Sequence, residues 1–178
     1  GLDLTEQKIK KKKNKKKIKK ILVIAAYKKE KGYLELLKVA AILKNNEIKI
    51  ECYGYGDYYK FEMLKNKKNL SNIKFNKFDK NLRNKIKNYD IMLHLSKREG
   101  LPVALMQSLS EGLPVICYNI RGNNDLIKNE FNGFFINSYQ DVKKIILYLN
   151  LESNLIDKLR FNAFRTINKN YFKEKINS

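Results

Sequence analysis

Short apolar runs alternate with segments of helical period along most of the chain. The run Ile21–Ala26 is continuous, rich in branched residues and bounded by charge, which predicts a strand buried on both faces of a sheet. Residues 32–44 carry apolar side chains at helical spacing, which predicts a helix. Further strands are predicted at Ile48–Tyr53, Ile73–Phe75, Asp90–Leu95, Val115–Tyr118 and Gly133–Ile136. Further helices are predicted at 58–68, 79–87, 102–111, 123–128, 139–149 and 152–170.

This alternation predicts an α/β fold with a doubly wound parallel sheet. The chain has 178 residues, of which 43% are hydrophobic, and that is enough to bury one core. We expect one domain over residues 21–178, ending in a long carboxyl-terminal helix. Sheets of this kind bind ligands beyond the carboxyl ends of their strands. The loops of interest are therefore 27–32, 54–57, 76–79, 96–102 and 119–124.

Positive charge is concentrated at the amino-terminal end. The formal net charge is +20, and residues 8–20 contribute ten lysines without an acidic residue. Like charges at this density resist packing, so we expect residues 1–20 to form a basic arm or linker. Three interpretations stay open: a general lysine bias with no specific partner, an anionic membrane surface, and nucleic acid. We expect peripheral membrane contact before nucleic-acid binding, because aromatic residues are not interleaved with the basic ones.

Several other classes of protein and site do not fit the composition. The longest apolar run, Ile21–Tyr27, is too short to predict a membrane-spanning helix. Two cysteines and one histidine give no disulfide framework and no plausible zinc site, so we expect no metal. Cys52 and Cys117 fall in predicted strands, which is typical of buried free thiols in a reducing cytoplasm. His94 also lies in an apolar strand, and we predict a satisfied core residue rather than a base.

The stretch Ser96–Ile127 carries the clearest chemical signal. Glu99 and Gly100 lie in a strand-to-helix loop, where Gly100 permits close approach of the backbone to a ligand. The unpaired amides and the dipole at the start of the next helix favour an anion such as phosphate. Gln107 lies on the opposite side of that helix from the core, so it can border the same cleft as Glu99. Lys31 could place a point charge on the same phosphate groups.

These residues resemble a known family, and the resemblance covers about residues 21–172. The chain is similar to the carboxyl-terminal, donor-binding domain of the retaining glycosyltransferases of family 4, also called group 1, which have the GT-B fold. Its most specific stretch is Glu99–Ile127, in which the family has a Glu, seven residues and a second Glu. The chain has Glu99 and Gln107 at those two positions. The turn Gly54–Asp57 resembles the family's Gly-x-Gly turn beside the nucleotide.

The resemblance implies a role for each matching residue. Glu99 would act on the donor sugar as the catalytic residue, and Lys31 would meet its diphosphate. The backbone of Gly100, Leu101, Pro102 and Val103 would help to hold the sugar and diphosphate. Gln107 would bond the ribose, and Gly54 and Gly56 would lie beside the nucleotide. The implied function is hexose transfer from a nucleotide-diphosphate sugar, with no cofactor, in capsule, lipopolysaccharide or exopolysaccharide assembly. The implied location is the cytoplasm of a bacterium or the inner face of its membrane.

The match departs from the family pattern at two places. Gln107 replaces a glutamate, and Ala25–Ala26 stands where a Gly-Arg pair commonly supplies a second cation. Both changes weaken the expected donor site. The resemblance also implies an amino-terminal acceptor domain that this chain does not contain. We therefore expect it to bind a nucleotide sugar weakly and catalyse nothing alone. The apolar surplus of residues 152–170 could cover the seam with that domain.

Two other functional classes remain open at this point. In the first, the pocket has decayed, and a non-catalytic domain binds a polyanion or a protein partner through its basic surface. Alternatively, the chain could belong to a GT-B epimerase or phosphorylase, although the loop around Glu99 favours a transferase.

Overall fold

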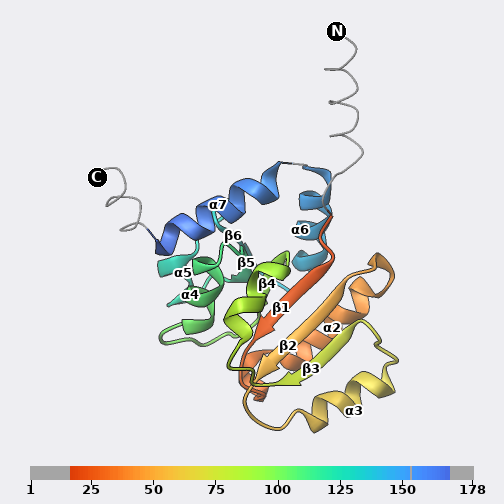
Figure 1. The fold of residues 1–178 in the computed structure, drawn as a ribbon. Helices are drawn as coiled ribbons and strands as arrows, with labels where there is room; N and C mark the ends of the chain where they lie inside the picture. The colour runs from red at the N-terminus through yellow and green to blue at the C-terminus, as the bar shows by residue number, and fades with distance from the viewer. Residues whose placement is uncertain (1–16, 153, 169–178) are drawn as a thin grey trace, which may run out of the picture.

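A parallel sheet forms the centre of the computed structural model, which describes residues 17–152 and 154–168 (Figure 1). Its six strands lie in the order β3-β2-β1-β4-β5-β6, and every neighbouring pair is parallel. The strands are β1 (Lys20–Ile24), β2 (Lys49–Gly54), β3 (Ile73–Lys77), β4 (Ile91–His94), β5 (Val115–Tyr118) and β6 (Gly133–Ile136). The predicted α/β, doubly wound parallel sheet is therefore confirmed.

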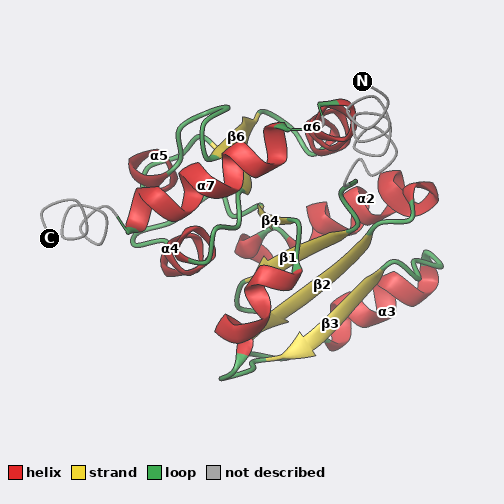
Figure 2. Ribbon diagram, turned by 45° about the horizontal axis from the view of Figure 1, so that its top comes forward, coloured by secondary structure: helices red, strands yellow, loops and turns green. Residues whose placement is uncertain are grey.

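Helices connect the strands and cover both faces of the sheet (Figure 2). The α-helices are α2 (Tyr33–Leu43), α3 (Tyr59–Lys67), α4 (Val103–Ser110), α5 (Asn123–Leu126), α6 (Gln140–Leu151) and α7 (Leu155–Ile167). Three short 3₁₀ helices accompany them: η1 (Lys29–Lys31), η2 (Lys44–Asn46) and η3 (Leu82–Asn88). None of the helices in the described part of the chain is both long and apolar enough to cross a membrane.

Successive strand residues enter two separate cores because their side chains alternate between the faces. Ile21 and Val23 of β1 pack with α2, α3 and α6 on one face. Leu22, between them, packs with η3 and α4 on the other. All three side chains are at least 94% buried, which explains why the strand reads as one continuous apolar run.

The connections reverse direction at β1. From β1 the chain passes outward through β2 to β3, then returns across the sheet and continues through β4 and β5 to β6. The carboxyl ends of β1 and β4 therefore lie side by side at the point where the winding changes sides. In open α/β sheets this switch point leaves a crevice for a ligand.

Most expected boundaries differ from the structure by one or two residues, and three further differences concern η3, Pro102 and the last helix. The segment 79–87, expected as a helix, is the 3₁₀ helix η3 and begins at Leu82. Pro102, expected in the first turn of α4, is the residue before it, with φ of −81° and ψ of 73°. The long carboxyl-terminal helix begins at Leu155, not at residue 152. Its predicted continuation beyond Asn168 lies outside the described residues.

The arm expected over residues 1–20 ends earlier than the charge pattern indicated. Ile18 is 3% exposed and its amide donates to Oδ1 of Asn150, 2.8 Å away. The amides of Lys19 and Lys20 both donate to Oδ2 of Asp90, at 2.8 and 2.9 Å. Backbone bonding and one buried isoleucine thus join residues 18–20 to the domain while their lysine charges stay in solvent. The expectation for residues 1–16 lies outside the described part of the chain.

The apolar side of α7 is largely used within this domain. Ile156, Leu159 and Ala163 are buried, and the helix packs along α4. Ile156 and Leu159 join the core that contains Ile21, whereas Ala163 joins the core on the other face. Ile156 and Leu159 are therefore not a surplus available to another domain, and the expectation that they cover its seam is wrong for these two residues.

Candidate functional site

A cavity of about 400 Å³ lies beyond the carboxyl ends of β1, β2 and β4. Segments far apart in the sequence form its walls: the ends of those strands, the loop after β3 with the start of η3, and the first turns of α4. Its lining residues are Ile24, Ala25, Ala26, Lys31, Tyr53, Gly54, Tyr55, Phe78, Asp79, Lys80, Leu82, Arg83, His94, Glu99, Leu101, Pro102, Val103, Ala104 and Gln107. The cavity therefore occupies the switch point of the sheet.

Lys31 and Glu99 meet in this cavity. Nζ of Lys31 lies 3.0 Å from Oε1 of Glu99, and both side chains are mostly buried. Gly32 holds the turn that presents Lys31, since its φ of 82° is one that side-chain-bearing residues rarely adopt. A Cβ on Gly32 would also lie 2.6 Å from the carbonyl oxygen of Leu95. Close backbone packing between the two loops thus brings the cation to the carboxylate.

The carboxyl group of Glu99 is held in its ionised form. Nε2 of His94 lies 3.1 Å from the same Oε1, and the Glu99 side chain is 11% exposed. The neighbouring imidazole first, and then the Lys31 ammonium, lower the pKa of Glu99 to about 2, against the opposing effect of burial. Glu99 is therefore an acceptor of hydrogen bonds at neutral pH and not a proton donor.

His94 differs from the sequence prediction in one respect. It is buried as expected, at 4% exposure, but it is not satisfied. Nε2 forms no well-aligned hydrogen bond within the described residues, in spite of its closeness to Glu99. Its place as the last residue of β4 is the signal that sequence reasoning missed, because strand ends of this sheet border the ligand crevice.

The loop that carries Glu99 is fixed from its other side as well. Nζ of Lys97 lies 3.6 Å from Oε2 of Glu35 on α2 and 5.3 Å from the ring centre of Tyr118 on β5. The Tyr118 hydroxyl donates to Oε1 of Glu35, and burial followed by that carboxylate raises the pKa of Tyr118. Within the loop, the Ser96 hydroxyl donates to the carbonyl oxygen of Arg98 at 2.8 Å. Contacts with α2 and β5, together with this bond inside the loop, thus support the position of Glu99.

The start of α4 forms another wall of the cavity. Leu101, Pro102 and Val103 line it, and Gln107 lies exposed on the same side, one turn further along the helix. The expected set of free amides is smaller than the sequence suggested. Proline has no N–H, and the amide of Val103 donates to the carbonyl oxygen of Leu101 at 2.9 Å. The amide of Ala104 follows in the same wall, and its N–H could bind an anion.

The glycines expected beside the ligand do not all reach the cavity. Gly54 lines it, and a Cβ there would lie 1.9 Å from the carbonyl oxygen of Ala25, so close strand packing requires a glycine. Gly56 instead borders a separate hollow with Asp57 and neighbouring tyrosines. Gly100 lies on the far side of the Glu99 loop, and a Cβ there would meet nothing within 4 Å. The structure therefore brings Gly54 to the cavity and leaves Gly56 and Gly100 outside it.

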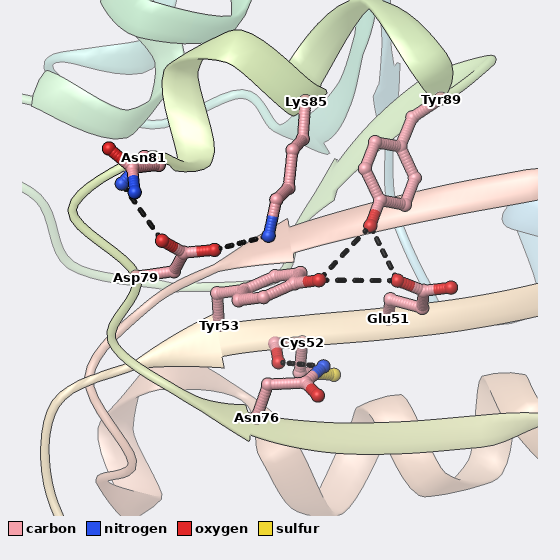
Figure 3. Close-up of polar contacts among 8 residues, drawn as sticks. All are labelled: Glu51, Cys52, Tyr53, Asn76, Asp79, Asn81, Lys85 and Tyr89. Carbon is pink, nitrogen blue, oxygen red and sulfur yellow. Dashed lines mark hydrogen bonds and ion pairs between the residues drawn. The ribbon is translucent and has the colours of Figure 1, made fainter.

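Hydrogen bonds fasten the wall formed by η3 to the sheet (Figure 3). The hydroxyl of Tyr89, just after η3, donates to Oε2 of Glu51 on β2 at 2.5 Å, and Tyr53 approaches the same oxygen at 3.4 Å. Nζ of Lys85 lies 2.6 Å from Oδ2 of Asp79, which lowers the pKa of Asp79 and raises that of Lys85. The contact of Tyr89 thus attaches the end of the wall to β2, and the contact of Lys85 joins η3 to the loop before it.

This wall and the turn after β2 supply further lining residues to which the sequence pattern assigns no role. Lys80 and Arg83 add positive charge to the cavity, although Arg83 also pairs with Glu111 at 3.0 Å. Tyr55 and Phe78 stack at its edge, with ring centres 4.1 Å apart and planes 13° apart, and both are about half exposed or more. Phe78 belongs to no motif, and the position of residues 76–79 at a strand end is its only signal in the sequence. Tyr55, in contrast, lies within the Gly54–Asp57 turn that resembles the family's Gly-x-Gly turn.

Comparison with known proteins adds to this geometry. A stretch of 53 residues, 30% of this chain, is 49% identical to the Escherichia coli UDP-Gal:alpha-D-GlcNAc-diphosphoundecaprenol alpha-1,3-galactosyltransferase and covers 14% of that protein. The structure of S. aureus TarM in complex with UDP superposes with a TM-score of 0.78 at 23% identity, over 89% of this chain and 34% of TarM. The crystallised carboxyl-terminal domain of a group 1 glycosyl transferase from Francisella tularensis matches over 91% of both chains, with a TM-score of 0.73 and 20% identity.

The two structural matches agree with the doubly wound sheet. The E. coli galactosyltransferase and TarM are much longer than this chain, which covers 14% and 34% of their lengths. The family model described as "Glycosyl transferases group 1" matches residues 5–165, which is most of the sequence. The chain therefore belongs to the group 1 glycosyl transferase family.

Proposed function

We propose that this chain is the donor-binding domain of a retaining glycosyltransferase that transfers a hexose from a nucleoside diphosphate in surface polysaccharide assembly. The observation that carries the proposal is the meeting of Lys31 and Glu99 in one cavity at the switch point of the sheet. A cation and an ionised carboxylate, side by side, suit a ligand that is anionic in one part and rich in hydroxyl groups in the next.

The lining residues divide between the parts of such a donor. Lys31 and the amide of Ala104 would meet the diphosphate, and Glu99 would accept hydrogen bonds from the sugar hydroxyls. Gln107 would bond the ribose. Lys80 and Arg83 would add the positive charge that Ala25–Ala26 does not provide.

The nucleotide in this proposal is UDP. The flat apolar surface of Tyr55 and Phe78 at the cavity edge suits a nucleobase, because every base can stack on an aromatic ring. The E. coli relative carries UDP-Gal in its name, and TarM was crystallised with UDP. The acceptor of that relative is a lipid-linked diphosphate sugar, which supports a role in polysaccharide assembly at a membrane.

Catalysis would depend on how strongly the site stabilises the leaving diphosphate. Breaking the bond between the sugar and the diphosphate places negative charge on the phosphate oxygen, and a preorganised cation and amide stabilise that charge. Glu99, ionised at neutral pH, would hold the sugar hydroxyls as the anomeric carbon becomes electron-poor. The acceptor would enter from an amino-terminal domain outside this chain, so we expect donor binding without transfer.

The test is isothermal titration calorimetry of the chain with UDP, UDP-galactose, UDP-N-acetylglucosamine and GDP- and ADP-sugars. We expect millimolar or tighter binding of one UDP-sugar, and measurably weaker binding in Glu99→Ala. If no nucleotide binds at millimolar concentration, the proposal is wrong. Binding of polyanions with a steep salt dependence would then favour the non-catalytic alternative.

The proposed location is the cytoplasmic side of a membrane, with peripheral attachment through the basic residues near the amino terminus. Ten lysines within residues 8–20 would attract anionic lipids. Co-sedimentation with phosphatidylglycerol vesicles, compared with phosphatidylcholine vesicles, tests this part independently of nucleotide binding. Equal sedimentation with both lipids would remove it.

A further inference from the structure

His94 occupies a position that its burial alone does not explain. The side chain is 4% exposed, yet it lines the cavity, and its Nε2 has no well-aligned hydrogen bond within residues 17–152 and 154–168. A buried polar atom without a partner costs free energy that an apolar side chain would avoid. The other residues of β4, Ile91, Met92 and Leu93, are apolar and fully buried. The arrangement therefore suggests a partner that His94 gains only in another state of the site.

That partner is already close, and it is shared. Oε1 of Glu99 lies 3.0 Å from Nζ of Lys31 and 3.1 Å from Nε2 of His94. Beside a carboxylate, Nε2 must carry a hydrogen, because two acceptors would repel one another. Two donors thus compete for one oxygen, and in this state Lys31 forms the aligned hydrogen bond.

The two donors differ in their freedom to move. The Lys31 side chain is 25% exposed, and a lysine carries its charge on a flexible four-carbon stem. His94 is fixed in the last position of a central strand, where it pairs in register with Cys117. A diphosphate in the cavity would therefore draw Lys31 toward itself, whereas the imidazole would stay where it is.

We infer that His94 is a positioning residue for Glu99: when Lys31 turns to the diphosphate of a bound donor, the released Oε1 of Glu99 aligns with the Nε2–H of the fixed His94 ring, which then keeps the carboxylate directed at the donor sugar. This inference rests on the proposed function. It predicts that His94 contributes to binding of the sugar and not of the nucleotide, because its effect acts through Glu99.

The experiment measures dissociation constants for UDP and for the UDP-sugar that binds, by calorimetry, in the wild-type chain and two variants. His94→Leu keeps the volume and removes the donor, and we expect it to weaken UDP-sugar binding about tenfold while leaving UDP binding within about twofold. His94→Gln places an N–H near the position of Nε2, so it should retain most of the affinity. In a Glu99→Ala background, His94→Leu should have no further effect, since the coupled partner is gone.

A second measurement does not depend on a variant that folds. The chain contains one histidine, so its imidazole nitrogens give an unambiguous signal in a ¹⁵N-labelled sample. We expect the Nε2 resonance to shift when the UDP-sugar is added. The inference is overturned if that resonance is unmoved, or if His94→Leu weakens UDP and UDP-sugar equally or neither. A wild-type chain that binds no nucleotide overturns the proposed function itself, and this inference with it.

Discussion

Lys31 and Glu99 lie 68 positions apart in the sequence and 3.0 Å apart in the structure, where they form an ion pair across the switch point of the sheet. Each follows a central strand, Lys31 after β1 and Glu99 after β4, and β1 and β4 are direct neighbours. The ion pair therefore joins the loops that follow the two central strands, and its two charges offset one another in the cavity.

Removal of the Lys31 charge should weaken nucleotide binding. In Lys31→Met the aliphatic stem is kept and the ammonium is lost, so we expect the dissociation constant for UDP to rise at least about tenfold. Lys28→Met is the matched control, because Lys28 is exposed and does not line the cavity. Calorimetry at constant ionic strength distinguishes the two. Equal weakening in both variants would mean that only the general positive charge matters.

Acid should destabilise the chain through Glu99. Its pKa is about 2 in the folded chain and near 4.5 when unfolded, so the ionised form stabilises the fold fully above about pH 4.5. That contribution, on the order of 2 kcal/mol, is lost as the pH falls from about 4.5 to 2. Urea unfolding over this range should show a steeper loss for the wild type than for Glu99→Gln. Glu47→Gln, at an 85% exposed side chain, should follow the wild type.

Substitution of Gly54 should disrupt the junction of β1 and β2. In Gly54→Ala the new methyl group would meet the carbonyl oxygen of Ala25 at 1.9 Å, and backbone cannot yield cheaply, so we expect a loss of roughly 3 kcal/mol or more. Gly100→Ala provides the comparison, since open space surrounds that position and stability should change by less than about 0.5 kcal/mol. Thermal unfolding gives both values. Similar melting temperatures for the two variants would contradict the close packing of Gly54 against the backbone of Ala25.

The hydroxyl of Tyr89 should matter for the wall formed by η3. Tyr89→Phe removes the donor to Glu51 and leaves a half-buried carboxylate with one weaker partner, so we expect a loss of about 1–3 kcal/mol. Tyr59→Phe is the control, because Tyr59 is 64% exposed. Chemical unfolding measures the difference in stability. If the two variants were equally stable, the contact would not fasten η3.

Sequence pattern predicted the sheet well because its signals are local. Strands β5 and β6 begin and end at the expected residues, since each is a short run of branched or aromatic residues beside a turn. The nature of η3 was missed, because periods of 3.0 and 3.6 residues are hard to separate over seven positions. Pro102 was misplaced by one residue, which is the usual uncertainty at a helix end.

The site was predicted in part for the same reason. Lys31, Glu99 and Gln107 stand at loop and helix positions that topology alone brings to one edge, and the structure places all three around one cavity. The contact between His94 and Glu99 depends on how the intervening loop folds back, and no pattern encodes that path. Arg83 reaches the cavity because the start of η3 lies beside the carboxyl ends of the strands, whereas the rest of η3 packs on one face of the sheet. Contacts of this kind depend on tertiary packing, so no periodic pattern in the sequence indicates them.

The strand order has a consequence for how the chain could assemble as it is synthesised. β1 emerges before the other five strands and lies at the middle of the sheet. Each later strand joins an edge that already exists: β2 beside β1, β3 beside β2, then β4 on the open side of β1, followed by β5 and β6. No strand has to insert between two others, so the sheet can grow outward from its oldest member during translation.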